Sequence, residues 1–171
     1  MNFLFKSENG FDTFKNYLIQ ESFLPKKVDY IKAKTNTGVA GVFTVKDKDY
    51  AAVLLNRPNS VEVAFTDTEN MDALLNVNPG ESIATHAKVP FSVLNSVFYV
   101  VIELMKDSPK KEVYFTGFNK SLDALYNKMV KNKSFLKEIE KAGYKYAGKN
   151  GDMYIFMRWF KPTLRFLWYN M

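Results

Sequence analysis

The stretch FTGFNKSLDALYNKM, residues 115–129, carries the side chains of this chain that are best placed to do chemistry. A β-branched and aromatic run leads through a turn at Gly117 into a helix that holds Asn119 and Tyr126. The phenol of a tyrosine can donate a proton or a hydrogen bond to a reacting group. A tyrosine on an apolar helix face is ordinarily a core residue, and an asparagine before a helix is ordinarily its cap. The residues alone leave both interpretations open.

Composition restricts the other kinds of chemistry. The 171 residues contain no cysteine and a single histidine, His86. Thiolate nucleophiles, disulfides and iron–sulfur clusters are therefore excluded, and a metal site built on imidazoles needs more than one histidine. A Ser/His/acid triad would have to use His86, but the serines near it lie in no nucleophile-elbow pattern. We expect no metal.

The elements that position Tyr126 are predicted from hydrophobic periodicity. Helices are expected over residues 9–20, 90–107 and 121–142, the last with a possible break near Asn132. Strands are expected over residues 29–34, 38–46, 49–56, 61–68, 72–77, 112–117, 144–148 and 152–160. The early strands are typical of an antiparallel meander, and strand-helix-strand units follow it. The prediction is an α/β chain of the α+β kind with a mixed sheet.

One domain is expected over residues 1–158, because a chain of this length builds one sizeable core. The tail WFKPTLRFLWYNM, residues 159–171, is dense in aromatic side chains, which are costly to leave in water. It is expected to pack on the core or to dock on a protein partner, with a membrane surface ranking behind both. The anchors for a partner would be Trp159, Phe160, Arg165 and Trp168.

The net charge of +6 permits acidic partners without demonstrating any. Residues 131–149 are rich in lysine, but glutamates alternate with the lysines, as is usual for a solvated helix. Nucleic acid is therefore a disfavoured partner that stays open. The N-terminus lacks the apolar core of a secretory signal, and the apolar run at residues 91–105 is short for a membrane span. We expect neither export by a signal peptide nor a transmembrane segment.

The order of elements around Tyr126 resembles the Gcn-related N-acetyltransferase (GNAT) superfamily. In that family a strand precedes a helix with the approximate motif N-x-x-A-x-x-L-Y, and a Gly-aromatic pair and a last strand follow. The matching positions are Asn119, Leu125 and Tyr126, with Leu122 in place of alanine, Gly143 and Tyr144 as the pair, and residues 153–158 as the last strand. The resemblance covers residues 60–158. The pattern of this part of the chain is similar to that of small GNAT-like proteins encoded by tailed phages. It implies a location in the host cytoplasm or on the virion.

The resemblance also implies a chemistry, the transfer of an acetyl group from acetyl-CoA to an amine. In the family the tyrosine of this helix often donates to the departing thiolate, which is the role implied for Tyr126, with Asn119 in the same motif. The general base would be Glu62, Glu103 or Glu112, and Glu62 is the candidate we name.

The loop NPGESIATHAKVP, residues 78–90, departs from the family pattern. The family holds the pyrophosphate of acetyl-CoA on a glycine-rich loop, where backbone N–H groups face the phosphates. The groups left for that task here are Gly80, Ser82, Thr85 and Lys88. We therefore expect a degenerate or atypical acetyltransferase domain. The alternatives are an active acetyl-CoA-dependent N-acetyltransferase and a non-enzymatic virion or host-interaction protein that docks through its tail.

Overall fold

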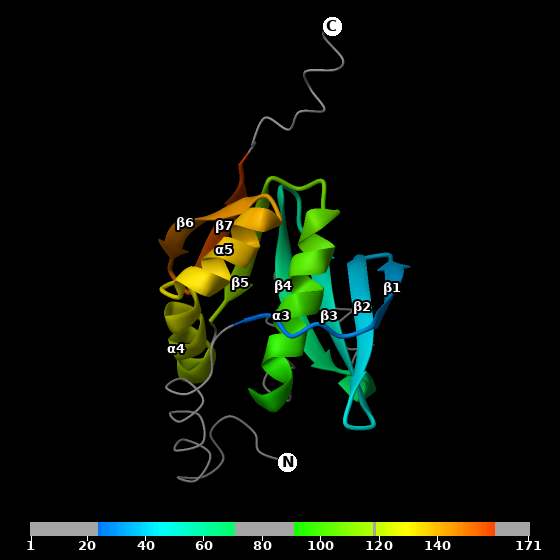
Figure 1. Ribbon diagram of the computed structural model, residues 1–171. Coiled ribbons are helices and arrows are strands. Elements are labelled where there is room, and N and C mark those ends of the chain that lie inside the picture. Colours follow the sequence, from blue (N-terminus) through cyan, green and yellow to red (C-terminus); the bar gives the residue numbers. More distant parts are fainter. Residues whose placement is uncertain (1–23, 71–90, 118, 160–171) are drawn as a thin grey trace, which may run out of the picture.

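The computed structural model describes residues 24–70, 91–117 and 119–159. Within these residues the chain forms one mixed sheet of seven strands, with three α-helices packed against it (Figure 1). The α/β class expected from the sequence is confirmed. The helix expected at residues 9–20, the strand expected at 72–77, the loop at 78–90 and the tail from residue 160 lie outside the described residues.

The first four strands form the meander that the sequence predicts. They are β1 (Tyr30–Thr35), β2 (Gly38–Val45), β3 (Lys48–Asn56) and β4 (Ser60–Asp67), and each pairs antiparallel with the next. Short turns connect them, so neighbours in the chain become neighbours in the sheet. A 3₁₀ turn at Thr68–Asn70 follows β4.

The second half of the chain adds helices and closes the sheet. The long helix α3 (Phe91–Lys106) precedes β5 (Glu112–Thr116), which pairs parallel with β4. Two shorter helices follow, α4 (Lys120–Met129) and α5 (Lys133–Lys141). The break expected near Asn132 is confirmed, because the Asn132 side chain accepts a hydrogen bond from the Phe135 N–H and caps α5.

The last two strands are β6 (Tyr144–Asn150) and β7 (Met153–Arg158). The order in the sheet is β1-β2-β3-β4-β5-β7-β6, so β7 lies between β5 and β6 and pairs antiparallel with both. The final hairpin therefore places the end of the described chain inside the sheet.

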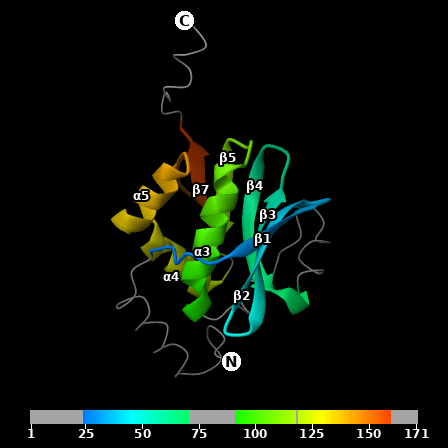
Figure 2. The same cartoon turned by 45° about the vertical axis from the view of Figure 1, so that its right-hand side comes forward.

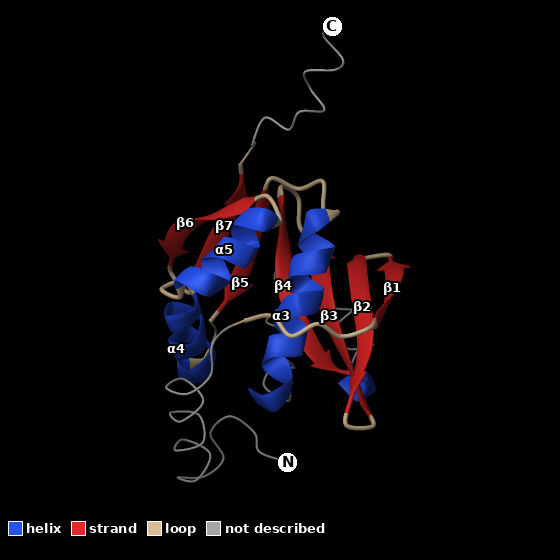
Figure 3. Cartoon of the chain, viewed as in Figure 1, coloured by secondary structure: helices blue, strands red, loops and turns tan. Residues whose placement is uncertain are grey.

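The three α-helices of the described residues lie on one face of the sheet, as two views separated by 45° show (Figures 2 and 3). We call this the helical face. It carries the main core, to which neighbouring strands contribute Val63, Phe115 and Phe156. The alternate residues Glu62, Tyr114 and Ile155 point to the opposite side, the second face. None of the described helices is long and apolar enough to cross a membrane.

Candidate functional site

The strands β4 and β5 pair over only part of their length. Residues Ser60 to Val63 face Glu112 to Phe115, and β4 then continues to Asp67, whereas β5 ends at Thr116. We call the place where the pairing stops, after Val63 and Phe115, the β4–β5 fork. Because α4 begins directly after β5, the fork brings the strand ends and the tyrosine helix together.

The start of α4 is determined by Asn119 and Gly117. The Asn119 Oδ1 accepts hydrogen bonds from the N–H groups of Ser121 and Leu122 at 3.0 and 2.9 Å, which makes Asn119 the helix cap. Gly117 lies so close to α4 that a Cβ there would come within 2.9 Å of the Asp123 Cα. A glycine is therefore needed where the strand turns into the helix.

Tyr126 points from α4 into the core of the helical face, and its side chain is 1% exposed. Its ring meets those of Phe115 and Tyr154 edge-on, with centroid distances of 5.3 and 5.7 Å. Burial raises the pKa of the Tyr126 hydroxyl strongly, and the negative charge of Glu62 adds to the effect. The phenol is thus a weak acid within an aromatic cluster.

Glu62 lies on the second face of β4 and forms a largely buried ion pair with Arg57. The Arg57 Nη2 and Nε donate to the Glu62 Oε2 at 2.5 and 3.0 Å, and both side chains are about one-eighth exposed, at 13% and 12%. The hydroxyls of Tyr114 and Thr116 also donate to this carboxylate, at 3.4 and 3.5 Å. Burial disfavours the charged guanidinium, but the hydrogen bonds to Glu62 and Tyr114 outweigh it and raise the pKa of Arg57.

Glu62 and Tyr126 therefore approach the fork from opposite faces of the sheet. Glu62 precedes Val63, whose partner on β5 is Phe115, and the Phe115 ring packs against Tyr126, so both groups lie near the same point of the sheet. An exposed carboxylate and a protonated phenol could act as a base and a donor on either side of a bound thioester. Here the carboxylate accepts from three neighbouring side chains and the phenol is covered, so neither group is free to meet a ligand.

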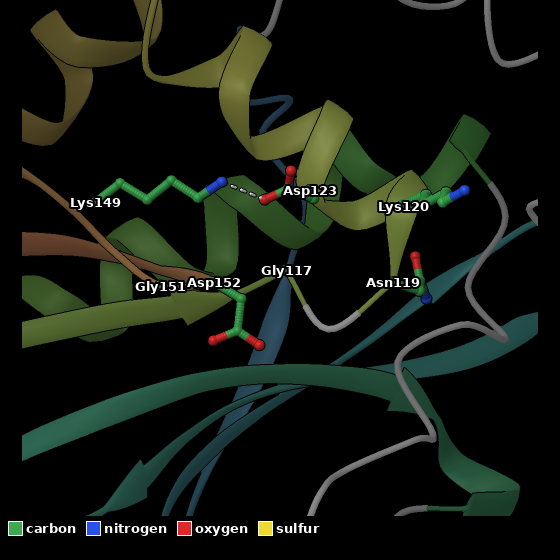
Figure 4. A pocket seen from close by; sticks show the side chains of 7 residues that line it. All are labelled: Gly117, Asn119, Lys120, Asp123, Lys149, Gly151 and Asp152. Atoms are coloured by element: carbon green, nitrogen blue, oxygen red, sulfur yellow. Dashed lines mark ion pairs between the residues drawn. The ribbon is translucent and has the colours of Figure 1, made fainter.

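A hollow of about 430 Å³ opens beside the fork, between the start of α4 and the turn from β6 to β7 (Figure 4). Its lining is Gly117, Asn119, Lys120, Asp123, Lys149, Gly151 and Asp152. The Lys149 Nζ reaches across it to the Asp123 Oδ1 at 2.8 Å. Two lysines and two aspartates balance in charge, so the hollow has no preference for an anion.

The Asp123 carboxylate also ties α4 to β7. Its Oδ1 accepts from the Tyr154 hydroxyl at 2.7 Å as well as from Lys149. The hydrogen bond from Lys149 has the largest effect and lowers the pKa of Asp123; burial opposes it, and the hydrogen bond from Tyr154 lowers the pKa again. The folded state thus binds this proton less tightly than the unfolded chain does.

We expect a corresponding loss of stability in acid. The Asp123 contribution is fully present above the ordinary pKa of an aspartate, about 3.9, and disappears as the pH falls through the lowered value. The variant Asp123→Asn, compared with wild type by urea unfolding at neutral pH and near pH 3, should lose less stability on acidification. Asp107→Asn, which breaks an exposed pair with Lys32, serves as the control. Equal acid losses in wild type and Asp123→Asn would contradict the assignment.

The other candidates from the sequence lie apart from the fork or outside the described residues. Glu103 is on α3 and pairs with Lys106 at 2.5 Å, and Glu112 is at the start of β5. Trp159 follows β7, beneath the Lys145 Nζ, which is 4.1 Å from its ring centroid. The candidates outside the described residues are Gly80, Ser82, Thr85, Lys88, Phe160, Arg165 and Trp168.

Sequence reasoning missed the partners that hold the candidate groups, namely Arg57, Asp123, Lys149 and Tyr154. Of these contacts, only the pairing of Arg57 with Glu62 could have been predicted from local sequence, because the two residues flank a turn and are five residues apart. Within the described residues, no group of three or more acidic, histidine or cysteine side chains is arranged to hold a metal ion. Comparison with models of known families finds no match, and neither curated proteins nor solved structures match the chain.

Proposed function

We propose that this protein is a GNAT-like domain of a degenerate or atypical kind. It keeps the sheet and the tyrosine helix of an acetyltransferase but does not carry out ordinary acetyl transfer. Three features support the kinship, which are the parallel pairing of β4 with β5, the fork between them, and the tyrosine helix directly after β5. The last strand then closes against β5. The order of strand, tyrosine helix and last strand is the order that the sequence resemblance implies.

One observation carries the second half of the proposal, the covered phenol of Tyr126. A donor to a thiolate must touch the sulfur, and a 1% exposed side chain can touch only its protein neighbours. Burial also raises the pKa of this phenol further above that of a thiol, about 8.5, which makes proton transfer to a thiolate less favourable. The described residues therefore do not fit acetyl-CoA without repacking Phe115 and Tyr154.

A thermal-shift and calorimetric titration with acetyl-CoA tests the proposal. A ligand present at about 100 times its Kd stabilises the folded state by about 2.7 kcal/mol, which a melting curve detects easily. We expect no stabilisation by millimolar acetyl-CoA or by CoA. The control is Tyr146→Phe, because Tyr146 is a half-buried tyrosine on β6, away from the fork. Saturable binding of acetyl-CoA that Tyr126→Phe weakens and Tyr146→Phe leaves unchanged would overturn the proposal that the domain has lost acetyl transfer.

The same titration decides the alternative, an active acetyl-CoA-dependent N-acetyltransferase. The observation in its favour is the approach of Glu62 and Tyr126 to the two sides of the fork. If acetyl-CoA binds, release of free CoA in the presence of a panel of amines should follow, and Glu62→Gln should reduce that rate. A phage origin and a location in the host cytoplasm or on the virion both stay predictions.

A further inference from the structure

The second face of β7 carries a row of apolar side chains. Tyr154 and Phe156 face the helices, so the alternate residues Met153, Ile155 and Met157 point to the second face. The same alternation places Trp159, the residue after Arg158, at the end of this row. We call Met153, Ile155, Met157 and Trp159 the β7 row. Met157 is 39% exposed, and the other three are half-buried.

The strands on either side leave the β7 row accessible. On the β6 side, Lys145 is opposite Met157, and Gly148, which has no side chain, is opposite Ile155. A Cβ added at Gly148 would meet no atom within 4 Å. By contrast, Val53 and Ala64 on the second face of the meander are completely buried. Apolar side chains on the second face are therefore left partly uncovered at β7, as Ile31 is on β1, and apolar area left in water is unfavourable.

The chain leaves the described structure at one end of this row. The backbone N–H of Trp159 donates to the Gly143 carbonyl at 3.0 Å, and the Trp159 ring lies under the Lys145 ammonium. The described chain therefore ends at Trp159, at one end of the β7 row. The twelve residues that follow, FKPTLRFLWYNM, are rich in large apolar side chains and include Trp168.

The remaining chain is long enough to return along β7. Met157 and Met153 are four strand residues apart, which is about 13 Å. Residues 163–171 span about 13 Å as a helix and about 30 Å when extended, so either conformation covers the row. Pro162 is a residue type common in turns, and it stands where a reversal would be needed.

Charge on the flank of the row is compatible with the same segment. Glu112 on β5 is opposite Met157 and takes part in no ion pair among the described residues. The tail carries Lys161 and Arg165 and no acidic residue. On the β5 side of the row the Glu112 carboxylate thus complements the charge of the tail, whereas on the β6 side the Lys145 ammonium lies over the Trp159 ring.

We propose that residues 160–171 fold back and cover the β7 row, as an apolar strap that completes the second face of the sheet. An attached segment has an effective concentration in the millimolar range over a short linker, so it occupies such a row ahead of a free partner at cellular concentration. The tail is then part of the folded domain. This inference is independent of the acetyltransferase proposal.

Fluorescence of the full-length chain tests the strap, because the protein has two tryptophans. In the variant Trp159→Phe, Trp168 is the only tryptophan and reports on the tail alone. We expect its emission at short wavelength and weak quenching by acrylamide. Adding Met157→Lys, a change at a 39% exposed position, should move the emission to longer wavelength and increase quenching. Circular dichroism verifies that the variant stays folded.

The matched control is Ile31→Lys in the same background, which places the same charge on an exposed apolar residue of β1, at the other edge of the sheet. It should leave the emission of Trp168 unchanged. A solvent-like emission that Met157→Lys does not change would overturn the proposal. An emission that shifts with protein concentration, together with a dimer mass by light scattering, would overturn it in favour of a second copy of the chain.

A truncation provides a second measurement. A chain that ends at Trp159 should melt at a temperature lower by about 5 °C or more. In the truncated chain, Met157→Lys should cause little additional loss of stability, because the stability effects of two changes that remove the same contact are not additive. A truncated chain that melts at the wild-type temperature would remove the strap.

Discussion

Replacing Tyr126 with alanine is expected to lower the free energy of unfolding by about 3–5 kcal/mol, the range for removing a large buried aromatic side chain. The ring is buried and makes edge contacts with Phe115 and Tyr154, which also lose a partner. Urea unfolding followed by circular dichroism measures the loss. A change of this size would identify Tyr126 as a major part of the core.

The informative comparison is Tyr126→Phe, which removes the hydroxyl and keeps the ring. Its effect on stability should be within about 1.5 kcal/mol, the usual net contribution of one hydrogen bond. A packing role predicts a large loss for alanine and a small one for phenylalanine. Losses that are small for both variants would mean that the phenol is open to solvent, and the proposed loss of acetyl transfer would lose its support.

Replacing Gly38 with alanine is the second change with a large expected effect, a loss of about 3 kcal/mol. An added Cβ at Gly38 would lie 1.9 Å from the Leu54 carbonyl oxygen, far inside contact distance. That oxygen belongs to the backbone of a central strand, which cannot move without disturbing its pairing with β2 and β4. Thermal and urea unfolding of Gly38→Ala measure the effect.

Gly41 provides the matched comparison on the same strand. A Cβ there would meet the Val100 Cγ1 of α3 at 2.4 Å, which is a side-chain atom that a second substitution can remove. Gly41→Ala combined with Val100→Ala should therefore cost less than the sum of the two single changes. No second change of this kind is available for Gly38. If Gly38→Ala were as stable as wild type, the register of β2 against β3 would be wrong.

Local pattern determined the existence and type of most described elements. The strands of the meander follow from alternation, and the turns follow from their polar residues, because both depend on near neighbours in the chain. Asn119 was predicted as a helix cap for the same reason, since a cap bonds to N–H groups two or three residues later, and near Asn132 only a break was predicted. The tyrosine helix after β5 was therefore predictable, together with the α/β class.

The tertiary structure decided what each candidate group faces. No local pattern places β7 between β5 and β6, or sets the short pairing that leaves β4 to run past β5, because these depend on contacts between distant segments. The periodicity of α4 put Tyr126 on an apolar face but did not tell a packed ring from an open site. The partners that cover it, Phe115 and Tyr154, come from two separate strands. Sequence determined which residues could do chemistry, and packing decided that Tyr126 is closed off, because burial depends on everything that surrounds a side chain.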